Sequence, residues 1–77
     1  MDVKVYTTNT CPYCKMVMEF LRDNDVEFEE VNVQTNRKAA TEIVERTGQT
    51  MVPVTEINGR LIVGYNIDAI KEELAKN

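Results

Sequence analysis

The chain has 77 residues, with 13 acidic and 9 basic side chains, no histidine and a formal net charge of −4. A chain of this length builds one small core, so we interpret residues 1–77 as a single domain without a large buried cavity. The acidic balance without a basic cluster excludes a typical nucleic-acid binder, and the short apolar runs exclude a membrane-spanning helix.

The first half of the chain predicts a strand, a helix and a second strand. Apolar and polar residues alternate over residues 2–7, which is typical of a half-buried strand. Apolar residues recur at helical spacing over Pro12–Asp23, and proline suits the first helical position. Residues 26–33 are rich in strand-forming types, but the alternation slips at Glu29–Glu30, where we expect an irregularity or an early loop.

The second half of the chain predicts a helix, a hairpin and a last helix. Asn36 is a helix-cap type, apolar residues follow it at helical spacing, and Gly48 ends that helix. Residues 52–64 indicate two strands joined by Asn58–Gly59, which is the strongest short signal for a hairpin turn. Asn66 then caps a helix with apolar residues on one face.

The predicted order of elements is therefore β-α-β-α-β-β-α. The first strand, helix and strand form a right-handed crossover between parallel strands. The hairpin adds two strands, of which one is antiparallel to the rest. We expect an α/β fold in which a four-stranded mixed sheet is flanked by three helices.

The stretch TCPYCK places the only two cysteines, Cys11 and Cys14, where the first strand passes into the first helix. The free N–H groups and the positive dipole end of a helix start favour a thiolate, so we expect the pKa of Cys11 to lie below the free-thiol value of about 8.5. Pro12 starts the helix beside this sulfur, and Lys15 adds a nearby positive charge. Cys14 lies within the first turn, where we expect it to be more buried and more thiol-like.

The spacing of the two cysteines suits a reversible disulfide. Residues three apart on a helix share a face, with Cβ atoms about 5–6 Å apart, so the bond can close and reopen without large backbone movement. Cys11 would attack a substrate disulfide to form a mixed disulfide, and Cys14 would then resolve it.

Three other interpretations of the cysteine pair are open. A zinc site needs four ligands as a rule, so without a histidine or a second cysteine pair it would require two chains. A purely structural disulfide across so short a loop would remove little conformational entropy from the unfolded chain. Two inert core cysteines fit poorly with a Pro-Tyr pair at a helix start. We therefore assign no metal ligands and favour redox chemistry.

Val52–Pro53 opens the predicted third strand about forty residues after the cysteines. Proline cannot donate to a strand ladder and is tolerated where the backbone turns outward. If the bond before Pro53 is cis, the N–H and C=O of Val52 face the region of Cys11, where an extended peptide can pair as an added strand. The alternative is an ordinary proline at the start of an edge strand.

The segments YTTNTCPYCKM, GQTMVPV and INGRLIVGYN together resemble a glutaredoxin of the thioredoxin-like fold, and the resemblance covers nearly the whole chain. The sequence CPYC is typical of the dithiol glutaredoxin active site. The resemblance implies a thiol–disulfide oxidoreductase with Cys11 as nucleophile, Cys14 as resolving thiol and a cis bond before Pro53. It also implies that Tyr13 flanks the thiol and shapes the substrate groove.

The resemblance further implies a groove for glutathione as a co-substrate, in which this chain departs from the family pattern. Thr8 stands where glutaredoxins usually have a lysine, and Arg37 or Lys38 can supply the missing positive charge. The usual Thr-Val-Pro is Met51–Pro53, and the usual Gly-Gly-x-Asp is Val63–Asn66, whose last side chain lacks the charge. The expected substrate-binding residues are Thr8, Tyr13, Arg37, Lys38, Met51, Val52, Pro53, Gly64, Tyr65 and Asn66.

These departures are similar to those of a neighbouring group, the ribonucleotide-reductase-associated redoxins that are reduced by thioredoxin reductase. The CPYC sequence favours glutathione as the electron source, and the groove favours the reductase. A further alternative is a carrier of a two-iron cluster held between two protomers with glutathione. Pro12 disfavours this carrier because proline stiffens the loop and removes a hydrogen-bond donor.

The same residues predict the setting in which the protein works. The N-terminal stretch MDVKVY is too polar for a signal peptide. Two cysteines in a reducing cytosol indicate a reactive pair rather than a permanent structural disulfide. We expect a cytoplasmic monomer with no bound cofactor, whose partners are disulfide-containing proteins and either glutathione or thioredoxin reductase.

Overall fold

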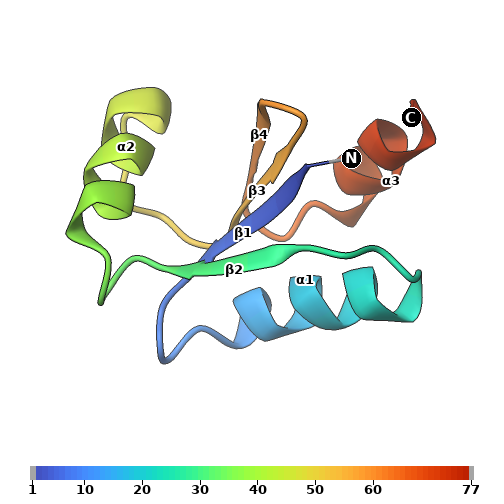
Figure 1. The fold of residues 1–77 in the computed structure, drawn as a ribbon, viewed down its shortest axis with the longest axis horizontal. Helices are drawn as coiled ribbons and strands as arrows, with labels where there is room; N and C mark the ends of the chain where they lie inside the picture. The colour runs from blue at the N-terminus through green and yellow to red at the C-terminus, as the bar shows by residue number, and fades with distance from the viewer. Residues whose placement is uncertain (1, 77) are drawn as a thin grey trace.

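The structure of the chain is a computed structural model that describes residues 2–76. Its elements follow the order predicted from the sequence (Figure 1). They are β1 (Val3–Thr7), α1 (Pro12–Asp23), β2 (Glu29–Asn32), α2 (Arg37–Thr47), β3 (Val54–Ile57), β4 (Arg60–Val63) and α3 (Ile67–Ala75). Within the described residues, no helix has the length and apolar character needed to cross a bilayer.

The four strands form one mixed sheet in the order β2-β1-β3-β4. β1 and β2 run parallel, whereas β3 is antiparallel to both of its neighbours, β1 and β4. The register pairs Tyr6 of β1 with Val54 of β3, and Val54 with Val63 of β4. The predicted α/β fold, with a four-stranded mixed sheet and three helices, is confirmed.

Helices cover both faces of the sheet. On one face, Val17 and Leu21 of α1 and Ile70 of α3 are fully buried against apolar strand residues. On the other face, Ile43 of α2 packs against Tyr6 of β1. Figure 1 shows α2 well separated from α1 and α3. Each fully buried aliphatic side chain stabilises the fold by about 1.5–3 kcal/mol, so the helices are held by these apolar contacts.

The predicted caps and turns have the expected geometry. The side-chain oxygens of Asn36 and Asn66 accept hydrogen bonds from the backbone N–H three residues on, at 3.0 and 3.2 Å. Gly48 ends α2 with a φ of 76°. Asn58 and Gly59 have φ values of 49° and 92°, and two successive positive φ values are what a type I′ hairpin turn requires.

The predicted second strand is only partly correct. Strand pairing begins at Glu29–Glu30, where we expected an irregularity. Residues 26–28, which we expected to belong to the strand, form an unpaired connection before it. The backbone N–H of Val26 donates to the carbonyl of Leu21 at 2.9 Å, so it closes the end of α1 instead of joining the sheet. The two glutamates lie on an edge strand and are exposed, which removes the need for alternating burial there.

A polar network ties α2 to the β3–β4 hairpin. The hydroxyl of the buried Tyr6 donates a hydrogen bond to Oε1 of Glu56 at 2.9 Å. Arg46 of α2 lies 3.4 Å from Oε2 of Glu56 and donates to the carbonyl of Gly59 at 3.0 Å. Burial, followed by the hydrogen bond to Glu56, raises the pKa of Tyr6 to about 12.

This raised pKa makes stability depend on pH in the alkaline range. The phenol of Tyr6 titrates near 10 in the unfolded chain and near 12 in the folded one, so its stabilising contribution is complete below about pH 10 and is lost as the pH rises through about 12. Below about pH 10, Tyr6→Phe should lower the free energy of unfolding by about 1 kcal/mol. Urea unfolding of both proteins at increasing pH should show this difference shrinking; a constant difference up to pH 12 would contradict the assignment.

Candidate active site

Four segments that carry predicted site residues lie at the end of the sheet where β1 ends. β2 and β4 end there as well, and β3 begins there, because Thr7 pairs with Asn32 and Tyr6 pairs with Val54. Four connections between elements therefore lie at this one end of the sheet. They are residues 8–11, 33–36, 52–53 and 64–66.

The two cysteines lie at the start of α1 and are joined in a disulfide. Cys11 is the N-cap residue, and the backbone N–H of Cys14 donates a hydrogen bond to its Sγ at 3.1 Å. The two Cα atoms are 5.2 Å apart. The sequence prediction that this spacing permits a disulfide at a helix start is confirmed. The depressed pKa expected for reduced Cys11 stays a prediction, because the sulfur does not titrate while it is bonded.

The two sulfur-bearing residues differ in exposure and surroundings. Cys11 is 9% exposed, whereas Cys14 is 1% exposed and its Sγ lies 4.0 Å from the backbone carbonyl of Tyr6. The expected deeper burial of Cys14 is confirmed. Pro12 and Lys15 are both exposed beside the pair. Since a helix N-terminus favours negative charge, the N–H of Cys14 is placed to stabilise a thiolate on the more accessible sulfur.

Val52–Pro53 is a cis peptide, as the resemblance implied. Pro53 is buried, and its carbonyl accepts a hydrogen bond from the N–H of Gly64 at 2.8 Å. Val52 is half-buried, and neither its N–H nor its C=O has a hydrogen-bond partner within residues 2–76. These two backbone groups are therefore available to a ligand.

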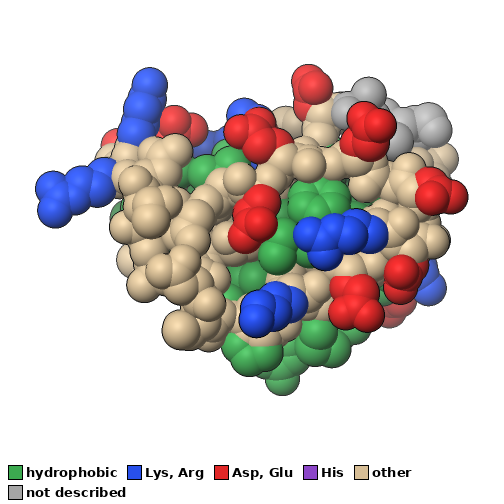
Figure 2. All heavy atoms as spheres, turned by 60° about the horizontal axis from the view of Figure 1, so that its bottom comes forward, with side chains coloured by type: hydrophobic (Ala, Val, Ile, Leu, Met, Phe, Trp, Pro, Cys, Tyr) green, Lys and Arg blue, Asp and Glu red, His purple; other side chains and the backbone are tan. Residues whose placement is uncertain are grey.

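Tyr13 and Tyr65, two of the predicted substrate-binding residues, are in direct contact. Their ring centres are 5.7 Å apart and the ring planes are tilted by 39°. The side chains are 57% and 46% exposed. Figure 2 shows the side of the molecule that carries α1, with hydrophobic side chains gathered along its lower edge and charged groups above them. The contact links the cysteine segment to the turn before α3.

Other predicted residues lie around this end of the sheet without a hydrogen bond or ion pair to either cysteine within the described part of the chain. Thr8 is half-buried directly after β1, Met51 is exposed, and Arg37 is exposed at the first position of α2. Lys38 lines a shallow hollow beside Glu42, between α2 and the sheet. Their roles in substrate binding stay predictions.

A polar network that the sequence did not indicate braces the segment before Cys11. The backbone N–H of Asn9 donates to Oε1 of Gln34 at 2.5 Å, and the side-chain amide of Asn32 donates to Oδ1 of Asn9 at 2.6 Å. The N–H of Gln34 donates back to Oδ1 of Asn32 at 2.9 Å. The partners across the two loops are 23 and 25 residues apart, so no local pattern could have revealed them.

Metal-binding groups are sparse in the part of the chain that the structure describes. Within residues 2–76 there is no cluster of three or more His, Cys, Asp or Glu side chains able to hold a metal ion.

The family follows from comparison with known proteins. The family model described as Glutaredoxin matches residues 3–62. The chain belongs to the glutaredoxin family. An uncharacterized glutaredoxin-like 8.6 kDa protein in the rubredoxin operon of Clostridium pasteurianum is 38% identical over 74 residues, which are 96% of this chain and 99% of the relative. Glutaredoxin 3 of Escherichia coli strain K12 is 35% identical over 72 residues, 88% of this chain and 87% of the relative.

Solved structures agree with this glutaredoxin assignment. Glutaredoxin grx-1 from Archaeoglobus fulgidus has a TM-score of 0.85 and 29% identity, covering 95% of this chain and 85% of that chain. The glutaredoxin-like NrdH-redoxin from Escherichia coli, described as having a thioredoxin-like activity profile, has a TM-score of 0.82 and 25% identity, covering 94% and 93%. The chain is a thiol–disulfide oxidoreductase with a CXXC pair, as the sequence predicted.

The difference between the two cysteines predicts the order in which they react. In the reduced glutaredoxin, iodoacetamide near neutral pH should modify Cys11 well before Cys14, because Cys11 is more exposed and receives the helix N–H bond. Mass spectrometry of peptides after limited alkylation measures the order. Denatured protein, in which the two thiols should react alike, is the control. Faster modification of Cys14 in the folded protein would contradict the assignment.

Proposed function

We propose that this glutaredoxin reduces protein disulfides and glutathione mixed disulfides through a dithiol cycle of Cys11 and Cys14. The observation that carries the proposal is the geometry at the start of α1. Cys11 is the N-cap and the more exposed cysteine, and the N–H of Cys14 lies 3.1 Å from its sulfur. A nucleophilic thiol needs access and a stabilised thiolate, and this position supports both.

The cycle begins with both thiols reduced. The thiolate of Cys11 attacks one sulfur of the substrate disulfide, forming a mixed disulfide while the other substrate sulfur leaves as a thiolate. Cys14 loses its proton to solvent, and its thiolate attacks Sγ of Cys11. This step forms the Cys11–Cys14 disulfide and releases the second substrate sulfur. Two electrons have then passed to the substrate, and an external thiol reductant must return them.

The backbone of Val52 would hold the substrate beside the reactive sulfur. Its N–H and C=O have no hydrogen-bond partner within the described residues, and it lies in the connection that enters the same end of the sheet as the cysteines. An extended peptide can pair with these groups as an added strand, with main-chain bonds giving affinity for many sequences. Met51, exposed next to it, offers a pliable apolar contact.

Glutathione is the electron source we propose, because the CPYC site has the dithiol glutaredoxin pattern. Two glutathione molecules would reduce the Cys11–Cys14 disulfide in turn, leaving as glutathione disulfide. Positive charge for the glutathione carboxylates would come from Arg37 or Lys38 at the start of α2, with Thr8, Gly64 and Tyr65 lining the groove. Asn66 accepts the N–H of Ala69 as the cap of α3, and its side-chain amide can donate to a carboxylate.

Reduction by a thioredoxin reductase is the second candidate. Thr8 and Asn66 replace the charged residues that glutaredoxins commonly use for glutathione, which weakens that groove. The similarity to the NrdH-redoxin, with its thioredoxin-like activity profile, supports this alternative. In both cases we propose a cytoplasmic monomer that needs no resident cofactor, since the two sulfurs supply the chemistry.

Serine variants test the dithiol cycle. Cys11→Ser should reduce turnover to the uncatalysed background, because no nucleophile remains, when reduction of insulin by dithiothreitol is followed by turbidity. Cys14→Ser should still form the first bond and accumulate a mixed disulfide, visible by mass spectrometry. Unfolding curves of both variants, compared with that of reduced wild type, confirm that they fold. Full activity of Cys11→Ser would refute the cycle.

A paired assay identifies the electron source. The oxidised protein is coupled separately to glutathione with glutathione reductase, and to thioredoxin reductase, while NADPH consumption is followed. We expect rapid turnover with glutathione and little with thioredoxin reductase. Cys11→Ser, which cannot cycle, is the control for direct reduction of the substrate. The reverse outcome would assign the chain to the reductase-dependent redoxins.

A further inference from the structure

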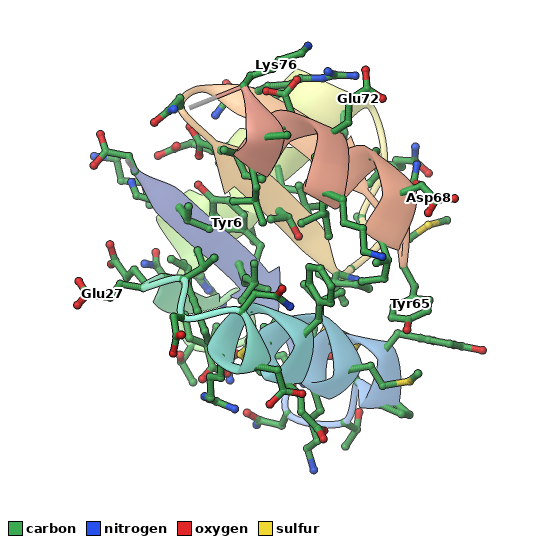
Figure 3. All side chains as sticks on the ribbon, turned by 90° about the vertical axis from the view of Figure 1, so that its right-hand side faces the viewer. Tyr6, Glu27, Tyr65, Asp68, Glu72 and Lys76 are labelled. Atoms are coloured by element: carbon green, nitrogen blue, oxygen red, sulfur yellow. A yellow bond between two sulfur atoms is a disulfide. The ribbon has the colours of Figure 1, made fainter. Side chains whose placement is uncertain are left out.

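A groove lies between α1 and the turn before α3. A hollow of about 270 Å³ is lined by Met16, Glu19, Phe20, Asp23 and Tyr65, and we call it the Tyr65 groove. Its four α1 residues recur at helical spacing, so they form one stripe along the helix. Figure 3 shows Tyr65 between the start of α3 and the first turn of α1.

Tyr65 connects the groove to the reactive site, because it lines the groove and contacts Tyr13. Tyr13, which lies between the two cysteines in the sequence, contacts the ring of Tyr65 at 5.7 Å. With a rise of about 1.5 Å per residue, Glu19 and Asp23 lie roughly 12 and 18 Å from Cys11 along the helix. An extended peptide advances about 3.3 Å per residue, so a substrate bonded to Cys11 reaches these carboxylates with its fourth to sixth neighbouring residue.

The lining of the groove combines apolar surface with negative charge. The side chains of Met16 and Tyr65 are large, apolar and exposed. Glu19 and Asp23 are exposed on successive turns of α1, and neither has an ion-pair partner within residues 2–76. Two like charges four residues apart on a helix repel each other. A ligand with an apolar stem and a positive head would relieve this repulsion and cover the exposed surface.

The groove already holds a cation of this kind at its edge. Nζ of Lys71, from α3, lies 6.0 Å from the ring centre of Phe20. An ammonium or guanidinium group over an aromatic ring is attracted by the negative face of the ring. Arginine suits the remaining surface better than lysine does, because its planar guanidinium stacks on aromatic rings and pairs with carboxylates through two parallel hydrogen bonds.

We infer that the Tyr65 groove binds an arginine or lysine side chain carried four to six residues from the reactive cysteine of a protein disulfide. This inference rests on the proposed dithiol cycle and names its substrate class. The net charge of −4 acts in the same direction, since it attracts basic partners at long range. Glutathione has two carboxylates and one ammonium group, so Glu19 and Asp23 attract it less than they attract an arginine side chain. The two carboxylates therefore favour basic protein substrates over glutathione.

Three peptides that differ only in charge test the inference. Each has a central cysteine in a mixed disulfide with thionitrobenzoate, spacers of about four glycines and a residue X beyond each spacer, where X is Arg, Gln or Glu. Attack by Cys11 on the peptide sulfur releases coloured thionitrobenzoate. For each peptide, the rate of thionitrobenzoate release by the protein is divided by the rate of release by free mercaptoethanol. This ratio corrects for the intrinsic reactivity of the peptide disulfide. We expect the Arg peptide to react about fivefold faster than the Gln peptide, and less so in about 0.5 M salt.

Two double variants with the same change in net charge test which carboxylates cause the preference for the Arg peptide. Glu19→Gln combined with Asp23→Asn should remove most of the Arg preference, measured as the ratio of the Arg-peptide rate to the Gln-peptide rate within the same variant. Glu42→Gln combined with Glu45→Gln changes the net charge equally on the exposed face of α2, and it should retain the preference.

The outcomes separate the inference from the proposed function. Equal normalised rates for the three peptides, or equal loss of the preference in both double variants, would overturn the inference while the dithiol cycle stands. No thionitrobenzoate release with any peptide would overturn the dithiol cycle itself.

Discussion

The backbone N–H of Cys14 points at the sulfur of Cys11, and the surrounding structure serves to keep that geometry in place. Cys11 can be the N-cap only because β1 stops at Thr7 and the connection returns the chain to the sheet as α1. The polar network of Asn9, Asn32 and Gln34 braces this connection against the loop that follows β2. A helix start is thus held by both apolar packing and polar contacts, in a chain too short to enclose a cavity.

The sheet register gives this small protein a site built from distant parts of the chain. Three connections at one end of the sheet contribute to the site. They supply the reactive sulfur, the free backbone groups and the aromatic surface. The hydrogen bond between Gly64 and Pro53 fixes two of these connections to each other, and the contact of Tyr13 with Tyr65 fixes the third. In this arrangement the helix start supplies the reactive sulfurs, and the neighbouring connections are where we propose that substrates bind.

Local patterns in the sequence predicted most of the fold but little of the recognition surface. Asn36, Asn66 and the Asn58–Gly59 turn signal their structures through their own backbone preferences, so their positions were readable in advance. The start of the second strand was predicted too early, at residue 26 instead of Glu29, because the N–H of Val26 pairs with the preceding helix. The cysteine pair was recognisable from spacing alone. The Tyr13–Tyr65 contact joins residues far apart in the chain, and it follows only from the complete register.

The short edge strand β2 has a consequence for how the molecule behaves in concentrated solution. Its first two residues are exposed glutamates, and β2 is the outer strand next to β1. An open strand edge invites a second molecule to extend the sheet, and natural proteins counter this with charge and short length. A copy aligned along β2 would bring carboxylates face to face. This edge of the sheet thus resists the addition of a further strand.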